Sequence, residues 1–279
     1  TQKWTLFPYT TLFRSLGGIG SGVASALTYW LIMIISLYIV LKKKPFTKYP
    51  LFKKLYPVSF SKWKEILIIG VPIGLSIFFE TSIFSAVTLL MSSFDTVTIA
   101  SHQVALNFAS LLYMIPLSIS MALTILVGFE VGAGRIHDAK QYTIMGVVSA
   151  VLLSSICAVF LYFFRAEVAY LYTKDPEVIA LTTAFLLYAI FFQLSDAIAA
   201  PIQGALRGYK DVNVTFMLAF VSYWIIGLPI GYLLANFTEF GAFGYWIGLI
   251  CGLAAGAVGL SFRLSILQKR YIRTTVPIK

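Results

Sequence analysis

Charged residues are scarce in this sequence. They make up 11% of its 279 residues, whereas hydrophobic residues make up 59%. In ordinary soluble domains about a quarter of the residues are charged, so a chain this apolar would not stay in solution. The composition therefore excludes a soluble enzyme or a soluble binding domain and indicates a protein that lies in a lipid bilayer.

Cysteine is rare as well. Cys157 and Cys251 are the two present, and both fall in long apolar segments, so we predict small core residues rather than a disulfide or a metal-binding pair. No metal-ligand cluster, nucleophile elbow or phosphate-binding loop appears in the sequence. The glycines of residues 127–135 end an apolar segment and do not follow a strand, which argues against a nucleotide site. We therefore expect no cofactor.

Long apolar segments fill most of the chain. A helix needs about 20 apolar residues to cross a hydrocarbon core of about 30 Å. Seven segments meet this length: 16–41, 65–92, 99–128, 142–164, 179–205, 213–235 and 241–267. Apart from residues 42–64, the connections are too short for a separate soluble domain. The sequence thus predicts an all-α polytopic membrane protein with about seven transmembrane helices.

The basic residues fall mainly on one side of this predicted topology. The net charge of +10 raises the possibility of nucleic-acid binding, but the basic residues lie in short runs between apolar segments, a pattern that orients membrane proteins. Lys and Arg gather at 42–64, 135–140, 207–210 and 269–279, whereas the opposite loops contain only Arg165 and Lys174. We predict that the basic side, including the C-terminus, faces the cytoplasm, and we expect no nucleic-acid partner.

The first fifteen residues fit none of the later pattern. The stretch from Thr5 to Ser15 looks like the in-frame translation of a common sequencing adapter, so we expect residues 1–15 to be an artefact and exclude them from the fold. The natural sequence would then begin near Leu16, already inside an apolar helix. On this interpretation the chain is a fragment of a longer protein.

Glu80 and Asp196 are acids within apolar segments, whereas the other acidic residues lie in loops or at helix ends. A charge in hydrocarbon costs at least a few kcal/mol, so such a residue is expected to face a cavity, a partner or an ion. Glu80 lies roughly 24 Å along its helix from Lys64, and Asp196 lies roughly 16 Å from Arg207 at the same face. Helix tilt shortens both distances, so the two carboxylates could meet near the midplane.

Two adjacent carboxylates in a low dielectric need a compensating positive charge. The sequence places no Lys or Arg at their depth, so a proton, Na⁺ or a cationic substrate would supply it. Tyr113 lies in the middle of its segment and could add a hydroxyl ligand. An alternative is that one acid only bonds backbone at a helix break, since Pro72 and Pro201 lie within about two turns of the acids.

Four stretches of the chain resemble the multidrug and toxic compound extrusion (MATE) family, especially its NorM-like branch. They are GVPIGLSIFFE at 70–80, the segment 100–134 containing SHQVALNFASLLYMIP, LYTKDPEV at 171–178, and FQLSDAIAAPIQGALRGYKD at 192–211. They occur in the family's order and spacing, and the resemblance extends over nearly everything from Leu16 onward.

The resemblance implies a particular domain organisation. Family members have twelve helices in two six-helix lobes. Residues 16–41 would be the last helix of the N-lobe, 42–64 the basic cytoplasmic inter-lobe loop, 65–268 the six-helix C-lobe, and 269–279 a cytoplasmic tail. The missing N-lobe would be this chain's partner in a monomer of the bacterial inner membrane.

The resemblance also implies a function. Family members export organic cations in exchange for Na⁺ or H⁺. Glu80, Tyr113 and Asp196 match the family's cation site, and Phe84, Gln103 and Asp175 match positions that contact drugs. We therefore expect a secondary antiporter and not an enzyme. The coupling ion and the drug range stay open.

Two other functions remain possible on this sequence. A flippase for lipid-linked oligosaccharides of a related fold would need Arg or Lys in its cleft for pyrophosphate. An intramembrane transferase would need a catalytic cluster in its loops, which offer only His137 beside Asp138.

Overall fold

The computed structural model describes residues 17–43 and 59–275. Their helices are α2 (Gly17–Lys42), α3 (Phe60–Met91), α4 (Thr96–Gly132), α5 (Ile136–Tyr172), α6 (Pro176–Gly208), α7 (Val212–Phe220), the π-helical segment η2 (Val221–Gly227), α8 (Leu228–Phe237) and α9 (Phe243–Thr275). The part of the chain described contains seven helical spans long and apolar enough to cross a membrane, with α7, η2 and α8 forming one span. The predicted all-α membrane fold with about seven spans is confirmed.

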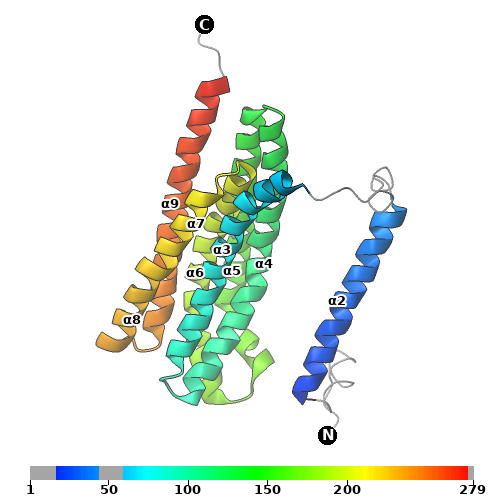
Figure 1. Ribbon diagram of the computed structural model, residues 1–279. Coiled ribbons are helices and arrows are strands. Elements are labelled where there is room, and N and C mark those ends of the chain that lie inside the picture. Colours follow the sequence, from blue (N-terminus) through cyan, green and yellow to red (C-terminus); the bar gives the residue numbers. More distant parts are fainter. Residues whose placement is uncertain (1–16, 44–58, 276–279) are drawn as a thin grey trace. The chain divides into compact units, whose positions relative to one another are not determined.

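Contacts divide the chain into two units at residue 60. Helix α2 lies in the first unit, and nearly all of its described side chains are exposed. The second unit is a bundle of the remaining helices, drawn from cyan to red in Figure 1. The adapter-like residues 1–15 lie outside the described residues, as does most of the loop predicted at 42–64.

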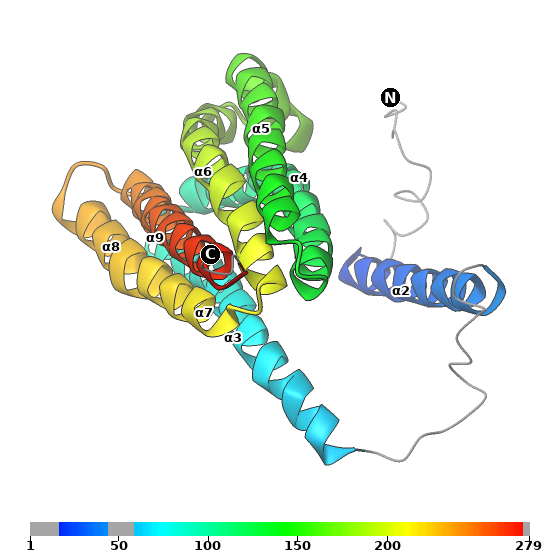
Figure 2. The same ribbon diagram turned by 90° about the horizontal axis from the view of Figure 1, so that it is seen from above.

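Helix α6 is the most buried element of the bundle and packs against α4, α5 and α9. The end-on view in Figure 2 shows α6 beside these helices. Small side chains allow this close packing, because a Cβ added at Gly204 would overlap the backbone oxygen of Ser120 in α4. The hydroxyl of Thr124 donates to the Gly204 carbonyl at 3.0 Å. Small residues and side-chain hydrogen bonds are the usual means of joining helices in membranes.

Helices α8 and α9 are joined in the same way. A Cβ at Gly248 of α9 would overlap the backbone of Gly231 in α8, and one at Gly252 would approach the carbonyl of Ser222 at 2.7 Å. Between α7 and α8 the chain forms η2, where the N–H of Leu228 bonds the carbonyl of Tyr223 five residues earlier. Pro229 follows immediately and has no N–H to donate, so the ladder of hydrogen bonds is interrupted there.

Several element boundaries differ from those predicted. Helix α3 begins at Phe60 rather than 65, and α9 continues to Thr275 rather than ending before a tail at 269. Charged residues such as Lys62 and Lys269 are good helix formers, but they lower the local hydropathy by which the segments were delimited. The single helix predicted at 213–235 is divided by η2.

The two cysteines correct another prediction. Cys157 is only half-buried and Cys251 is exposed, and both are free thiols. They were predicted as core residues because each lies in an apolar segment. In a membrane bundle, however, the outward faces of the helices are as apolar as the core, so hydropathy alone does not show which face a residue occupies.

Candidate functional site

Glu80 lies on α3 beside an aromatic cluster that holds this helix against α7 and η2. The ring of Phe79 lies 4.8 Å from that of Phe220 and 5.7 Å from that of Phe216, measured between centroids. The indole N–H of Trp224 donates to the backbone carbonyl of Phe79 at 3.3 Å. These contacts involve the residue directly before Glu80, so they fix the position of the carboxylate along the bundle.

Tyr113 of α4 and Asp196 of α6 meet Glu80 from the other side. The hydroxyl of Tyr113 donates to Oε1 of Glu80 at 3.1 Å. Asp196 is 3% exposed and interacts electrostatically with Glu80. Three residues that are distant in sequence are thus brought together by the packing of three helices.

A cavity of about 170 Å³ opens beside these three residues. Glu80, Tyr113 and Asp196 all line it, as do the aromatic side chains of Phe84, Phe192, Tyr223 and Trp246. The rings of Phe84 and Phe192 meet edge to face with centroids 5.7 Å apart. A second cavity of about 20 Å³ lies beyond, and both carboxylates also line it. The acids therefore stand between a larger and a smaller cavity.

A basic side chain is connected to this site, contrary to the sequence analysis. Gln203 is hydrogen-bonded to the Glu80 carboxylate, and Arg207 lies within electrostatic reach of it. Nη2 of Arg207 donates to Oε1 of Gln203 at 2.8 Å. The sequence analysis placed no Lys or Arg at the depth of the acids, because it took the charge of Arg207 to lie at the depth of the Arg207 backbone. A long arginine side chain carries its charge well away from its own Cα.

Sequence reasoning did not identify Tyr223 or Ser222, which η2 brings to the smaller cavity. π-Helical turns are rare and occur often at functional sites. The one signal in the sequence is Pro229, which closely follows η2 and cannot donate a backbone hydrogen bond.

His102 is a buried polar residue of α4. A lone histidine near a helix start suggests an interfacial residue, but this one is fully buried. Its Nδ1 accepts from the indole N–H of Trp246 at 3.1 Å, and its Nε2 lies 3.3 Å from the hydroxyl of Thr88. Because tryptophan can only donate, Nδ1 carries no proton and the ring is a neutral link between α4 and α9.

The predicted substrate residues are not all gathered at this cavity. Phe84 lines it, whereas Gln103 and Asp175 do not. Gln103 is exposed on α4, and the exposed Asp175 caps α6 by accepting from the N–H of Glu177 at 3.0 Å. This cap explains why an aspartate stands at the start of α6. The predicted roles of Gln103 and Asp175 in drug contact stay predictions.

Comparison with known proteins identifies the family. The MatE family model matches residues 72–233. Proteins described as "Probable multidrug resistance protein NorM" are 64% identical over 257 residues in Bacillus subtilis and 61% identical over 261 residues in Halalkalibacterium halodurans. These matches cover 92% and 94% of this chain and 57% of each relative. The chain thus spans a little over half the length of the curated relatives it matches.

Solved structures support the same fold. The eukaryotic MATE transporter AtDTX14 superimposes with a TM-score of 0.80 at 22% identity, covering 96% of this chain and 61% of its own. A MATE protein in a straight conformation gives a TM-score of 0.80 at 19% identity, covering 93% and 60%. At these identities the structural likeness concerns the fold, and the sequence matches carry the assignment. The chain therefore belongs to the MatE family, a family of membrane transporters and not of enzymes.

Proposed function

We propose that the protein carrying this chain is a secondary multidrug transporter that exports organic cations across a bacterial inner membrane in exchange for Na⁺ or H⁺. Glu80, Asp196 and Tyr113 form the proposed site of the coupling cation. The observation that carries the proposal is the meeting of two carboxylates and a phenol hydroxyl at one cavity within a bundle of apolar helices.

The charge balance of the site supports a coupling role. Arg207 interacts with Glu80, and a single guanidinium can offset one of two negative charges. The remaining carboxylate charge requires a proton, a metal cation or a cationic substrate, because an uncompensated charge in low dielectric is costly. Binding of the ion and binding of the drug would then compete for the same negative charge, which is the requirement for exchange.

The chemistry of the ligands favours a hard monovalent cation or a proton. Carboxylate and hydroxyl oxygens line the cavity, and oxygen ligands suit hard cations. Among the described residues, no group of three or more His, Cys, Asp or Glu side chains could hold a transition metal. A membrane potential contributes about 2.3 kcal/mol per charge per 100 mV, so inward movement of a single cation supplies useful work.

The aromatic lining supports an organic cation as the exported substrate. Phe84, Phe192 and Trp246 surround the acids, and aromatic faces attract cations that have lost their water. Gln103 and Asp175 would contact the drug elsewhere along its route. The described residues that line the cavity include no Lys or Arg, which a site for pyrophosphate-linked sugars would need.

Neutralising the acids tests the proposal. In proteoliposomes of the protein carrying this chain, Glu80→Gln or Asp196→Asn should abolish ethidium efflux driven by an imposed Na⁺ or pH gradient, because each removes a charge that the coupling cation must compensate. Measuring the two gradients separately identifies the ion.

Glu177→Gln is the matched control, since it neutralises an exposed acid in the first turn of α6, away from the cavity. It should transport like the unmodified protein. Normal efflux by both Glu80→Gln and Asp196→Asn at equal protein levels would refute the assignment of the site.

A further inference from the structure

Gln203 of α6 links the Glu80 carboxylate to Arg207. Its side-chain nitrogen donates to the hydroxyl of Ser76 in α3 at 3.4 Å and also bonds the Glu80 carboxylate. Its side-chain oxygen accepts from Nη2 of Arg207 at 2.8 Å. Because an amide group carries two N–H donors and one carbonyl oxygen, both donors and the oxygen of Gln203 are engaged. Gln203 is 8% exposed, so a buried amide that is bonded to α3 holds the guanidinium of Arg207.

The groups along α6 follow an order from the larger cavity to Arg207. Asp196 lines both cavities, and Phe192, one turn earlier, lines only the larger one. Ala200 and Gln203, which come after Asp196, line only the smaller one. Gln203 and Arg207 are one turn apart and share a face of the helix. The smaller cavity therefore lies on the Arg207 side of the acids, toward the end of α6 that the basic residues predict to be cytoplasmic.

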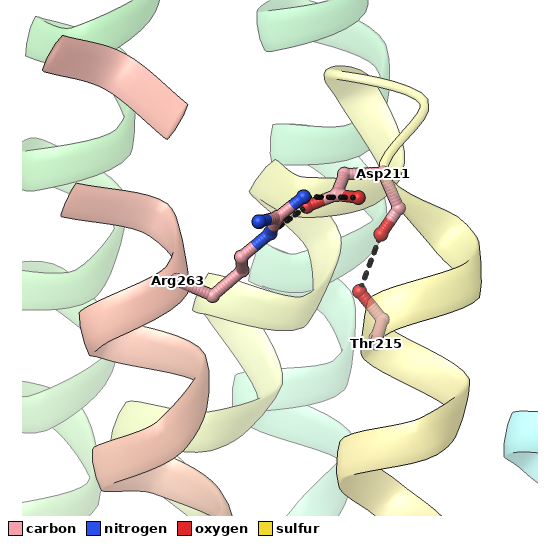
Figure 3. Close-up of polar contacts among 3 residues, drawn as sticks. All are labelled: Asp211, Thr215 and Arg263. Atoms are coloured by element: carbon pink, nitrogen blue, oxygen red, sulfur yellow. Dashed lines mark hydrogen bonds and ion pairs between the residues drawn. The ribbon is translucent and has the colours of Figure 1, made fainter. Parts of the chain in front are cut away.

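Arg207 differs in its charge compensation from Arg263, an arginine of α9. Nε of Arg263 lies 2.6 Å from Oδ2 of Asp211 and Nη2 lies 3.1 Å from Oδ1, and Figure 3 shows this two-point contact. Arg263 is thus neutralised by a carboxylate of its own. In the part of the chain that the structure describes, Arg207 makes no ion pair of this kind, and it interacts electrostatically with Glu80. The positive charge of Arg207 is therefore available to the acids of the proposed cation site.

We propose, on the basis of the proposed transport function, that Arg207 is a built-in counter-ion that competes with the coupling cation for Glu80, and that Gln203 holds it in reach. A cation bound between the acids and the guanidinium repel each other, so each lowers the affinity of the site for the other. When the cation leaves, the charge of Arg207 lowers the cost of ionised carboxylates in a low dielectric. Arg207 thus weakens cation binding and promotes release of the cation.

Arg207→Gln in the protein carrying this chain tests the competition. Ethidium efflux in proteoliposomes is measured over a range of Na⁺ concentrations and, separately, of proton concentrations. Because the variant removes the competing charge, the concentration of the driving ion at half-maximal efflux should fall about fivefold, which is the lower end of the usual coupling between interacting sites. Arg207→Lys keeps the charge and should stay close to the unmodified protein. Damage to the fold lowers the maximal rate but does not tighten cation binding, so the direction of the shift separates the two causes.

Gln203→Leu tests the link between Arg207 and the site. It removes the bond to Arg207 while the charge stays in the protein, so the half-maximal ion concentration should again fall. Residues that act through one contact are not additive, and the double variant should therefore show no further fall beyond that of Arg207→Gln. A fully additive double variant would overturn the role of Gln203. If Arg207→Gln does not fold, the fall expected for Gln203→Leu still tests the competition.

Lys210→Gln is the matched control, since it removes an exposed cation just beyond the end of α6 that lines neither of the two cavities. It should leave the ion dependence unchanged. An unchanged or raised half-maximal concentration in Arg207→Gln, or an equal fall in Lys210→Gln, would overturn the inference. The proposed function would survive that result as long as Glu80→Gln abolishes efflux. If neither ion drives efflux by the unmodified protein, the proposed function and the competition fail together.

Discussion

Single side chains at the proposed cation site depend on one another for position. Glu80 accepts from Tyr113 and is bonded to Gln203, which Arg207 holds in turn. Each partner comes from a different turn or helix, so the carboxylate is oriented from several sides before any ion arrives. Preorganised ligands lose less freedom on binding, and this favours selectivity.

Tyr113→Phe probes the hydroxyl alone. It removes the donor to Glu80 and one oxygen of the proposed site while the ring remains. A hydrogen bond to a charged group contributes about 1.5 kcal/mol or more, so the apparent affinity for the driving cation should fall about tenfold. The measurement is ethidium efflux in proteoliposomes as a function of the cation concentration.

Tyr232→Phe provides the comparison, because Tyr232 is an exposed tyrosine of α8 that does not line the cavity. It should leave the cation dependence unchanged. If Tyr113→Phe also gave an unaltered dependence, the hydroxyl would not be a ligand of the coupling cation.

Whole helices in this bundle are held at unequal strength. Helix α6 has buried residues along nearly its full length, whereas α3 buries only Ser76, Ile83, Val87 and Met91 among its described residues. Glu80 thus lies on a lightly packed helix and Asp196 on the most firmly packed one. A change in charge at Glu80 would therefore act on α3, which has fewer buried residues to hold it in place than α6 has.

Gly204→Ala tests the close packing of α6 on α4. The added methyl group would overlap the Ser120 backbone, and overpacking of this kind costs about 1–3 kcal/mol of unfolding free energy. The melting temperature in detergent, followed by near-UV circular dichroism, should fall. The same substitution at a glycine with free space around its Cα should instead raise the melting temperature.

Gly70→Ala serves as that comparison, since nothing lies within 4 Å of a Cβ at this position of α3. Its replacement should stabilise the helix by about 0.5–1 kcal/mol. Equal melting temperatures for the two variants would show that α6 and α4 do not approach as closely as described.

The molecule as a whole is polarised by its basic residues. The turns at Arg135–Lys140 and Arg207–Lys210 lie at one set of helix ends, and Lys174 lies at the other. Because loops rich in Lys and Arg stay on the cytoplasmic side, we predict that the turns at 135–140 and 207–210 face the cytoplasm and that Lys174 faces the outside.

Cysteine labelling checks this orientation. In a background with Cys157 and Cys251 replaced by alanine, Lys174→Cys should react with a membrane-impermeant maleimide added to intact cells. Lys140→Cys should react only after permeabilisation. Both positions are exposed, so access to reagent is limited by the membrane alone. Labelling of Lys140→Cys in intact cells, with Lys174→Cys protected, would reverse the predicted topology.

Much of this organisation was predictable from the sequence. The number and approximate limits of the spans follow from apolar length, because the bilayer sets the length of a crossing helix. The anomaly of Glu80 and Asp196 was equally visible, since charge in an apolar segment is costly wherever the helix lies. The resemblance to the family also identified Tyr113 and Phe84 as candidate site residues.

Other features could not be read from local sequence. Arg207 was assigned to the membrane face by its position, yet its side chain is linked to Glu80 through Gln203. Tyr223 lies in η2, a π-helical segment that the sequence pattern did not predict, and it lines the site. Cys251 faces outward in a segment whose two sides are equally apolar.

The sequence by itself determined that the chain lies in a membrane, how many of its segments are long and apolar enough to cross it, and which two acids are out of place. These are properties of hydropathy and charge, which are local and additive along a segment. Only the tertiary structure decided that the acids share a cavity and that Arg207 is linked to Glu80 through Gln203. Those outcomes depend on which helix faces meet, and in a chain apolar on every face the meeting is decided by small residues and buried hydrogen bonds.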